Sequence, residues 1–250
     1  MLLKNSSTVK INPKMICPNC QKPFYFLSLT DKQNLKCAKC SHSGSFVPPQ
    51  YSNYHYELYS KTRYDRHPKT DPQMDLIFRK MSPKNTDIVI DIGCGVGDYT
   101  KEIHKVSKNV TGIDIAIGTA KSRYPYINFL ESDCNKAIPV ASDSIDKIIS
   151  VNLIEHLIDP ERFLFECKRI LKPNGKIALT TANLDFILHS YFFDKTHLYE
   201  WTLREFEKLV SKYFIIDLAN KSSGMFKYYP INLLAAKFLK PDIIILGTKQ

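Results

Sequence analysis

The chain has 250 residues, of which 44% are hydrophobic, and a formal net charge of +10. This length accommodates one domain with a complete hydrophobic core and a small module beside it. No segment has the uninterrupted apolar length of a membrane span, and the N-terminal residues MLLKNSSTVKINPKM lack the apolar stretch of a secretory signal. We therefore expect a cytoplasmic protein with reduced thiols, neither membrane-spanning nor secreted.

The positive charge is concentrated in the first third of the chain. Residues 1–86 contain 14 Lys and Arg against 5 Asp and Glu, whereas residues 87–250 contain 21 against 20. A basic segment of this kind is typical either of a protein that binds a polyanion such as RNA or of a solvated, lysine-rich surface. Composition alone leaves both interpretations open.

Four of the seven cysteines form two C-x2-C pairs within this basic segment. Cys17 and Cys20 in CPNC precede Cys37 and Cys40 in CAKC, with sixteen residues between the pairs. This spacing is typical of a zinc ribbon, in which two knuckles supply four thiolates to one tetrahedral Zn²⁺. We predict a structural zinc-ribbon module over residues 1–45, because four protein ligands leave no open position for chemistry. Two disulfides, or a ribbon that has lost its metal, are the alternatives.

Residues 46–75 are predicted to be a basic, tyrosine-rich linker. They contain four prolines, five tyrosines and basic residues such as Arg63 and Arg66. This mixture favours extended and short helical pieces over a packed core. The aromatic and basic side chains could stack on bases or cover a cofactor pocket. Alternatively, the tyrosines pack the ribbon against the main domain.

Residues 76–250 are predicted to form an α/β domain with a mostly parallel, seven-stranded sheet. Short apolar runs alternate with segments whose apolar residues recur at helical spacing, a pattern that places helices on both faces of the sheet. In such a sheet, ligands bind at the carboxyl ends of the strands. The predicted strands cover residues 88–92, 110–114, 126–131, 146–151, 176–181, 213–218 and 242–248. The predicted helices cover residues 98–107, 117–124, 160–171 and 202–212.

The stretch VIDIGCGVGDYT, residues 89–100, joins the first strand to the first helix. Its glycines at positions 93, 95 and 97 allow the backbone to approach a ligand closely. The dinucleotide pattern G-x-G-x-x-G fails at its third glycine, because that position is Asp98. A nicotinamide cofactor is therefore disfavoured.

Polar residues also follow the next three strands. Asp114 ends the second strand, Asp133 follows the third, and Asn152 follows the fourth. With the glycine loop, this ordered set resembles the class I S-adenosylmethionine-dependent methyltransferases of the type 11 and type 23 groups, over roughly residues 75–250. The resemblance implies a Rossmann-like fold and S-adenosylmethionine (SAM) as the methyl donor.

The resemblance also implies which residues hold the methionine part of SAM. Asp91 and the turn formed by Gly93, Gly95 and Gly97 would lie against it. The glycine loop precedes a helix, and the N–H groups of a helix N-terminus favour a carboxylate. Cys94 belongs to this site as a small buried residue, not as a nucleophile.

The remaining cofactor residues implied by the resemblance follow the second, third and fourth strands. Asp114, with Ile115 beside it, would accept hydrogen bonds from both ribose hydroxyls, since a carboxylate offers two oxygens. Asp133 and the backbone of Cys134 would face the adenine amino group. Asn152 would lie beside the methyl-donor region. For each polar residue, the alternative role is that of a strand-end cap or turn former.

Two segments bear on the methyl acceptor. The residues after the fourth strand, NLIEH, lack both the Asn/Asp-Pro-Pro-aromatic motif of nitrogen methylation and the Pro-Cys pair of RNA cytosine C5 methylation. The segment DKTHLYEWT is similar to the D-x-T-H segment of small-molecule and glycan-tailoring methyltransferases. This implies His197 as a general base oriented by Asp194, with His156 an equal candidate. Alternatively, Asp194 shapes the turn and His197 packs beneath the following helix.

The leading hypothesis is a SAM-dependent methyltransferase that acts on a small-molecule or glycan-type acceptor, principally at oxygen. The runner-up is an RNA (rRNA or tRNA) methyltransferase, because a zinc ribbon ahead of a class I domain resembles the bacterial large-subunit rRNA guanine-N1 methyltransferases. An inactive binding module is a third reading. The intact Asp91, Asp114 and three glycines argue against it. The sequence does not predict an oligomeric state.

Overall fold

The computed structural model describes residues 15–16, 23–24, 72–186, 197–222 and 242–250. Near the N-terminus, β1 (Met15–Ile16) and β2 (Pro23–Phe24) pair in antiparallel fashion. The predicted zinc ligands and the predicted histidine-orienting residue lie outside the described residues: Cys17, Cys20, Cys37, Cys40 and Asp194. The zinc ribbon therefore stays a prediction.

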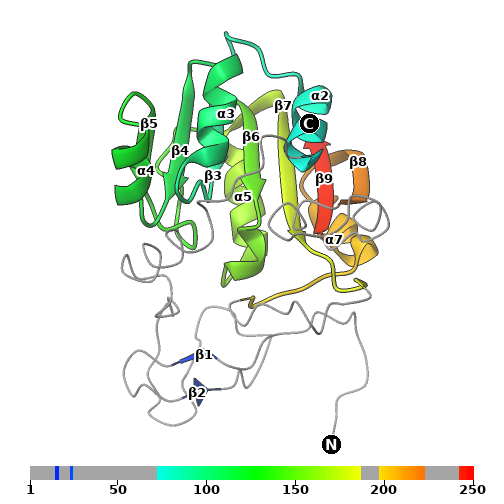
Figure 1. The fold of residues 1–250 in the computed structure, drawn as a ribbon. Coiled ribbons are helices and arrows are strands. Elements are labelled where there is room, and N and C mark those ends of the chain that lie inside the picture. The colour runs from blue at the N-terminus through cyan, green and yellow to red at the C-terminus, as the bar shows by residue number, and fades with distance from the viewer. Residues whose placement is uncertain (1–14, 17–22, 25–71, 187–196, 223–241) are drawn as a thin grey trace, which may run out of the picture.

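The main body is a seven-stranded sheet in the spatial order β5-β4-β3-β6-β7-β9-β8 (Figure 1). The strands from β5 to β7 run parallel, and β9 lies antiparallel between β7 and β8. The predicted α/β sheet is thus confirmed, with a mixed edge. The strands are β3 (Val89–Ile92), β4 (Val110–Asp114), β5 (Asn128–Glu131), β6 (Ile145–Val151), β7 (Leu171–Ala182), β8 (Ile215–Ser222) and β9 (Asp242–Thr248).

Burial along the strands follows their places in the sheet. All four residues of β3 are buried, and so are the first six residues of β9. Such apolar runs are typical of strands covered on both faces. The edge strands β5 and β8 consist mostly of exposed or half-buried residues. The apolar runs therefore place β3 and β9 inside the sheet.

Helices cover both faces of the sheet and enclose two cores. Phe163 of α5 (Pro160–Ile170) and Phe206 of α7 (Leu203–Val210) belong to one core. Ile103 of α3 (Asp98–Val106) and Ala120 of α4 (Gly118–Arg123) belong to the other. These four helices correspond to the four that the sequence predicts. No helix in the described stretches has the length and apolar character needed to cross a membrane.

Helix α2 (Pro72–Met81) is an element that the sequence analysis did not predict. Its residues Met74, Ile77 and Met81 are at most 3% exposed and join the core that contains α3 and α4. The amide of Gln73 donates to the hydroxyl of Ser222 at 3.1 Å, which ties α2 to β8. The predicted boundary between linker and main domain, at 75/76, therefore falls inside a helix that packs on the sheet. Proline fits the first position of a helix, so Pro72 begins α2 instead of interrupting it.

The strand order identifies the edge where a ligand would bind. The chain runs outward through β4 and β5 on one side of β3 and continues through β6 and β7 on the other side. In parallel α/β sheets, ligands bind at such a reversal, outside the carboxyl ends of the strands. The glycine loop follows β3, Asp114 ends β4, and Asn152 follows β6. The topology therefore brings these predicted residues to one edge.

Candidate active site

The loop between β3 and α3 has a backbone that requires glycine. Gly93, Gly95 and Gly97 have φ values of 77°, 55° and 84°, which L-residues rarely adopt. A Cβ atom at Gly93 would lie 2.9 Å from the Cβ atom of Leu153. A Cβ atom at Gly97 would lie 2.9 Å from Cζ of Phe129. The loop is thus packed between the segment after β6 and an aromatic ring of β5.

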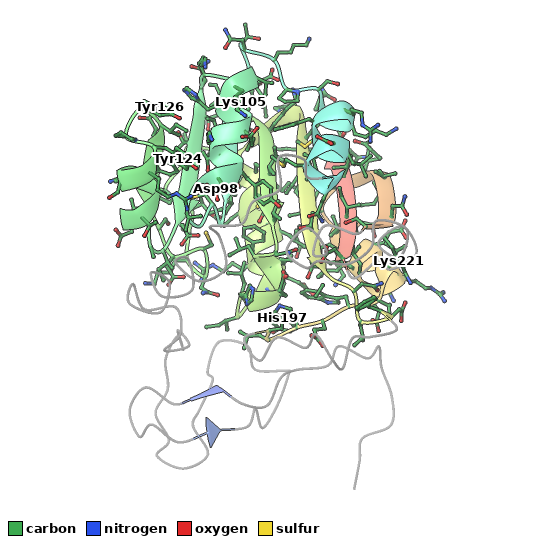
Figure 2. The ribbon with its side chains drawn as sticks, viewed as in Figure 1. Asp98, Lys105, Tyr124, Tyr126, His197 and Lys221 are labelled. Carbon is green, nitrogen blue, oxygen red and sulfur yellow. The ribbon has the colours of Figure 1, made fainter. Side chains whose placement is uncertain are left out.

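The N-terminus of α3 is arranged to receive an anion. Gly97 is the N-cap residue and offers no side chain to cap the first turn of the helix. N–H groups at a helix N-terminus favour carboxylates and phosphates. The side chain of Asp98, the first residue of the helix, is held by Tyr124: its Oδ1 accepts a hydrogen bond of 2.5 Å from the Tyr124 hydroxyl (Figure 2). The loop therefore fits the carboxylate of SAM.

We expect Gly97→Ala to destabilise the domain by about 2 kcal/mol, from left-handed strain and the contact with Phe129. The free energy of unfolding, measured in urea, tests this. Gly118→Ala is the matched control: a Cβ there has no atom within 4 Å, and φ is not positive. Equal stability of the two variants would contradict the account of the loop.

Asp114 anchors the glycine loop and keeps capacity for a ligand. It is 5% exposed. Its Oδ2 accepts from the N–H of Gly95 at 2.9 Å, and its Oδ1 accepts from the N–H of Ala116 at 3.0 Å. Burial raises the pKa of Asp114, and the backbone hydrogen bonds oppose that rise. Each carboxylate oxygen can accept another hydrogen bond. Asp114 therefore fits two ribose hydroxyls, with the half-buried Ile115 following it.

Asp91 is a nearly completely buried carboxyl group at the base of the same loop. It is 1% exposed, and its Oδ2 accepts a hydrogen bond of 2.6 Å from the Thr100 hydroxyl. Burial raises the pKa of Asp91 to about 7. A positive charge nearby would favour the ionised form. Asp91 is thus suited to the ammonium group of the methionine part of SAM.

Asp133 and Asn152 are held by local hydrogen bonds. Oδ1 of Asp133 accepts from the backbone N–H of Asn135 at 3.0 Å. Asn152 has a φ of 50°, and its Oδ1 accepts from the Thr180 hydroxyl at 2.9 Å. These contacts match the turn-former role that the sequence left open for both residues.

Cys94 and Cys134 are both 7% exposed. Burial raises the pKa of Cys134 to about 12 and that of Cys94 well above its usual range. Both thiols are therefore neutral near pH 7, and neither is a nucleophile. This agrees with their predicted role as small buried residues.

A second group of polar side chains, which we name the Glu-His cluster, consists of Glu155 and His156 after β6 and His197 beyond β7. One potential ligand atom of each residue lies within 4.8 Å of those of the other two. The imidazole rings of His156 and His197 have centroids 4.9 Å apart. The sequence predicts the two histidines as separate candidates. The structure brings them together, with His197 at the lower edge of the sheet in Figure 2.

Backbone hydrogen bonds hold the two segments of this cluster in place. Glu155 and His156 lie in the short 3₁₀ helix η2 (Ile154–His156). The N–H groups of Leu198 and Tyr199 donate to the carbonyl of Glu155 at 2.8 and 3.1 Å. The residues that follow His197 are thus fixed to η2. The geometry of the cluster does not depend on side-chain contacts alone.

The sequence analysis assigned no role to two carboxyl groups of this region. Glu155 is 1% exposed, and Glu200 is 4% exposed. Nδ1 of His197 lies 3.2 Å from Oε1 of Glu200. The only signal in the sequence was position, since Glu155 precedes His156 and Glu200 follows His197 by three residues. Glu200 thus lies beside the His197 ring, whereas Asp194, the predicted orienting residue, lies outside the described residues.

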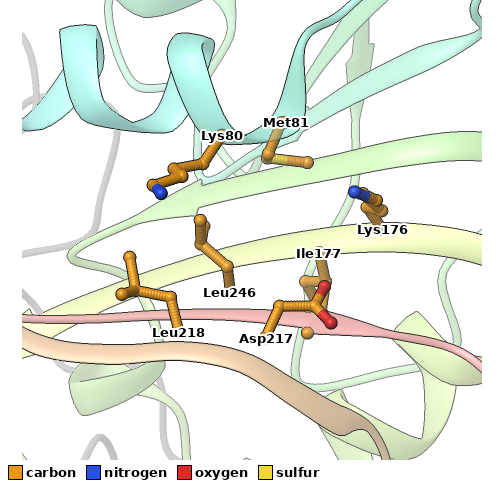
Figure 3. Close-up of a pocket in the computed structure, with 8 residues that line it drawn as sticks. Lys80, Met81, Lys176, Ile177, Asp217, Leu218 and Leu246 are labelled. Carbon is orange, nitrogen blue, oxygen red and sulfur yellow. The ribbon is translucent and has the colours of Figure 1, made fainter.

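A small cavity of about 80 Å³ lies elsewhere, between α2 and strands β7, β8 and β9 (Figure 3). One of the residues that line it is Lys176 of β7. In the register of the sheet, Lys176 is opposite Lys147 of β6, and Lys147 is opposite Val89 at the start of β3. The cavity is therefore level with the amino ends of the parallel strands. Ligand pockets usually measure about 300–1,000 Å³. This cavity is not the cofactor site.

Part of the chain is similar to known methyltransferases. Residues 90–179 match a family described as a methyltransferase domain. The probable S-adenosylmethionine-dependent methyltransferase Rv3030 of Mycobacterium tuberculosis is 30% identical over 112 residues, which are 43% of this chain and 40% of that protein. A ubiquinone biosynthesis O-methyltransferase of Coxiella burnetii is 31% identical over 110 residues, 41% of this chain and 47% of that protein. The chain thus matches less than half the length of these curated relatives.

Solved structures share the fold at low sequence identity. A SAM-dependent methyltransferase from Aquifex aeolicus superposes with a TM-score of 0.60 at 16% identity, over 80% of this chain and all of that one. Phosphoethanolamine N-methyltransferase 2 of Haemonchus contortus, in complex with SAM, gives 0.60 at 17% identity, over 80% of this chain and 58% of that one. Residues 90–179 thus match a methyltransferase domain, and the described sheet has the fold of these solved methyltransferases.

Proposed function

We propose that this protein transfers the methyl group of SAM to a hydroxyl oxygen of a small-molecule or glycan-type acceptor. The observation that carries the proposal is the Glu-His cluster beside the glycine loop. Leu153, two residues before Glu155, packs directly on Gly93. The O-methyltransferase named among the relatives supports oxygen as the acceptor atom.

The residues around the glycine loop divide the binding of SAM among them. Bound SAM supplies an electrophilic methyl carbon attached to a sulfonium. The N-terminus of α3 holds the carboxylate, Asp91 holds the ammonium group, and Asp114 holds the ribose hydroxyls. Asp133 and the backbone of Cys134 face the adenine. The cofactor is thereby fixed along the carboxyl ends of β3, β4 and β5.

The Glu-His cluster acts on the acceptor. A hydroxyl oxygen becomes a good nucleophile only as it loses its proton, and a neutral imidazole accepts such a proton near pH 7. His156 or His197 serves this purpose, with Glu200 orienting the His197 ring. Alignment of the oxygen with the methyl carbon and the leaving sulfur supplies the rest of the acceleration.

The test uses the purified full-length protein and SAM with a tritiated methyl group. Total RNA and a small-molecule and glycan extract are offered separately, and Asp114→Asn serves as the cofactor-binding control. Label in the low-mass or glycan fraction is the expected result. Label in RNA that nuclease releases would overturn the proposed acceptor. It would favour the predicted RNA methyltransferase, whose zinc ligands and most of whose basic linker lie outside the described residues.

A further inference from the structure

The Glu-His cluster contains the donor set of a metal centre. Two imidazoles and one carboxylate each offer a ligand atom, and these atoms lie within 4.8 Å of one another. Neighbouring ligands around a cation with bonds of about 2.1 Å lie roughly 3 Å apart, so modest side-chain rotation would complete the site.

Glu155 supplies a second, independent observation. Its side chain is 1% exposed, and its Oε2 accepts no hydrogen bond from any residue that the structure describes. A buried carboxylate oxygen without a partner is costly unless a cation or a donor satisfies it. One oxygen of the Glu155 carboxylate lies within 4.8 Å of a ring nitrogen of each histidine. A cation bound there would satisfy the buried carboxylate.

Glu200 completes the arrangement from behind His197. Its Oε1 lies 3.2 Å from Nδ1 of His197, and Glu200 is 4% exposed. A carboxylate at Nδ1 fixes the proton on that nitrogen and leaves the Nε2 lone pair for a ligand. Histidines that bind metals commonly donate their other N–H to a carboxylate in this way. The pair is therefore preorganised for coordination through Nε2.

From this geometry we infer that Glu155, His156 and His197 bind a divalent transition-metal cation, such as Mn²⁺, Fe²⁺ or Zn²⁺, that holds and activates the acceptor hydroxyl. Imidazole ligands favour these ions over Ca²⁺ and Mg²⁺, which prefer all-oxygen sites. Three protein ligands leave open positions for an acceptor oxygen. The catalytic use of this site rests on the proposed methyl transfer. The binding of the cation does not.

The cation takes over the task assigned above to a free imidazole. A hydroxyl group that binds a divalent cation through its oxygen loses its proton more readily, and that proton passes to the solvent. A lone pair of the oxygen then forms the new bond to the methyl carbon. The carbon–sulfur bond breaks and leaves its electron pair on sulfur. The products are a methyl ether, the neutral thioether S-adenosylhomocysteine and one proton.

Titration of the full-length protein with Mn²⁺, followed by electron paramagnetic resonance, tests the site. Mn²⁺ suits nitrogen and oxygen ligands, so it avoids the predicted four-thiolate site. Wild type is expected to bind one Mn²⁺ and to show nitrogen couplings from imidazole in pulsed spectra. Glu155→Gln and His197→Asn should weaken binding at least tenfold. Glu131→Gln, an exposed carboxylate at the end of β5, should leave it unchanged.

Elemental analysis of the purified proteins covers the case in which a native metal already fills the site. An equivalent of metal that wild type carries and Glu155→Gln lacks would support the inference as well. His156→Asn replaces Glu155→Gln if the buried substitution prevents folding. Absence of Mn²⁺ binding and of any metal that depends on the cluster would overturn the inference. So would Mn²⁺ binding that all three substitutions leave intact.

Two further outcomes separate this inference from the proposed function. A metal bound at the cluster without methyl transfer to any acceptor pool would uphold the site and overturn the proposed function. Methyl transfer that is as fast after loss of the metal as before would overturn the activating role and leave the proposed function standing.

Discussion

Asp114→Asn should bind SAM about 100-fold more weakly than wild type, a loss of roughly 3 kcal/mol. The substitution turns one acceptor oxygen into an NH₂ donor. Both oxygens of Asp114 accept backbone hydrogen bonds, from Gly95 and Ala116. The new donor must therefore face one of these N–H groups or leave the site, and a ribose hydroxyl loses its partner. Isothermal titration calorimetry measures the effect.

A matched control separates the loss of the ligand contact from general damage. Asp143→Asn removes an exposed carboxylate that pairs with Lys249, far from the glycine loop, and should leave SAM affinity unchanged. A SAM analogue without the ribose hydroxyls should bind wild type and Asp114→Asn with similar affinity. If the analogue still distinguishes the two proteins, Asp114 acts only as an anchor of the loop.

The sequence predicted the sheet well because the burial of each strand dictates which of its residues are apolar. Isoleucine-rich runs such as β9 are typical of strands covered on both faces. The glycine loop was equally predictable, since its φ values permit little besides glycine. Helix α2 was missed because its apolar residues follow a stretch rich in proline and tyrosine. Only its packing on the sheet shows that the pattern is helical.

The chemistry of the acceptor side was only partly predictable. A single sequence shows that Glu155 lies among apolar residues but not that it is buried or which residues it meets. The hydrogen bonds from Leu198 and Tyr199 to the Glu155 carbonyl bring two distant segments together. Nothing in local spacing encodes that contact. For the same reason, His156 and His197 were predicted as equal alternatives, although they are neighbours in the structure.

Asp91→Asn should make the protein more stable at pH 8, by up to about 4 kcal/mol. Burial raises the pKa of Asp91 from 3.8 to about 7 in the folded protein. The folded state therefore holds this proton more tightly than the unfolded state. As a result, the free energy of unfolding of wild type falls as the pH rises from about 4 to about 7. Asparagine carries no charge at any of these values and can still accept the hydrogen bond from Thr100.

Urea unfolding of wild type and Asp91→Asn at pH 4, 5.5 and 8 tests this sign. The two stabilities should be similar at pH 4 and diverge as the pH rises, while Asp91→Asn binds SAM more weakly because the ammonium group loses its ionic partner. Curves that stay parallel across this range would show that Asp91 is not destabilising when ionised. Divergence together with weaker binding would show that the ionised Asp91 destabilises the protein without ligand and that a bound cation offsets this loss. Such behaviour is expected of a residue whose position serves its ligand.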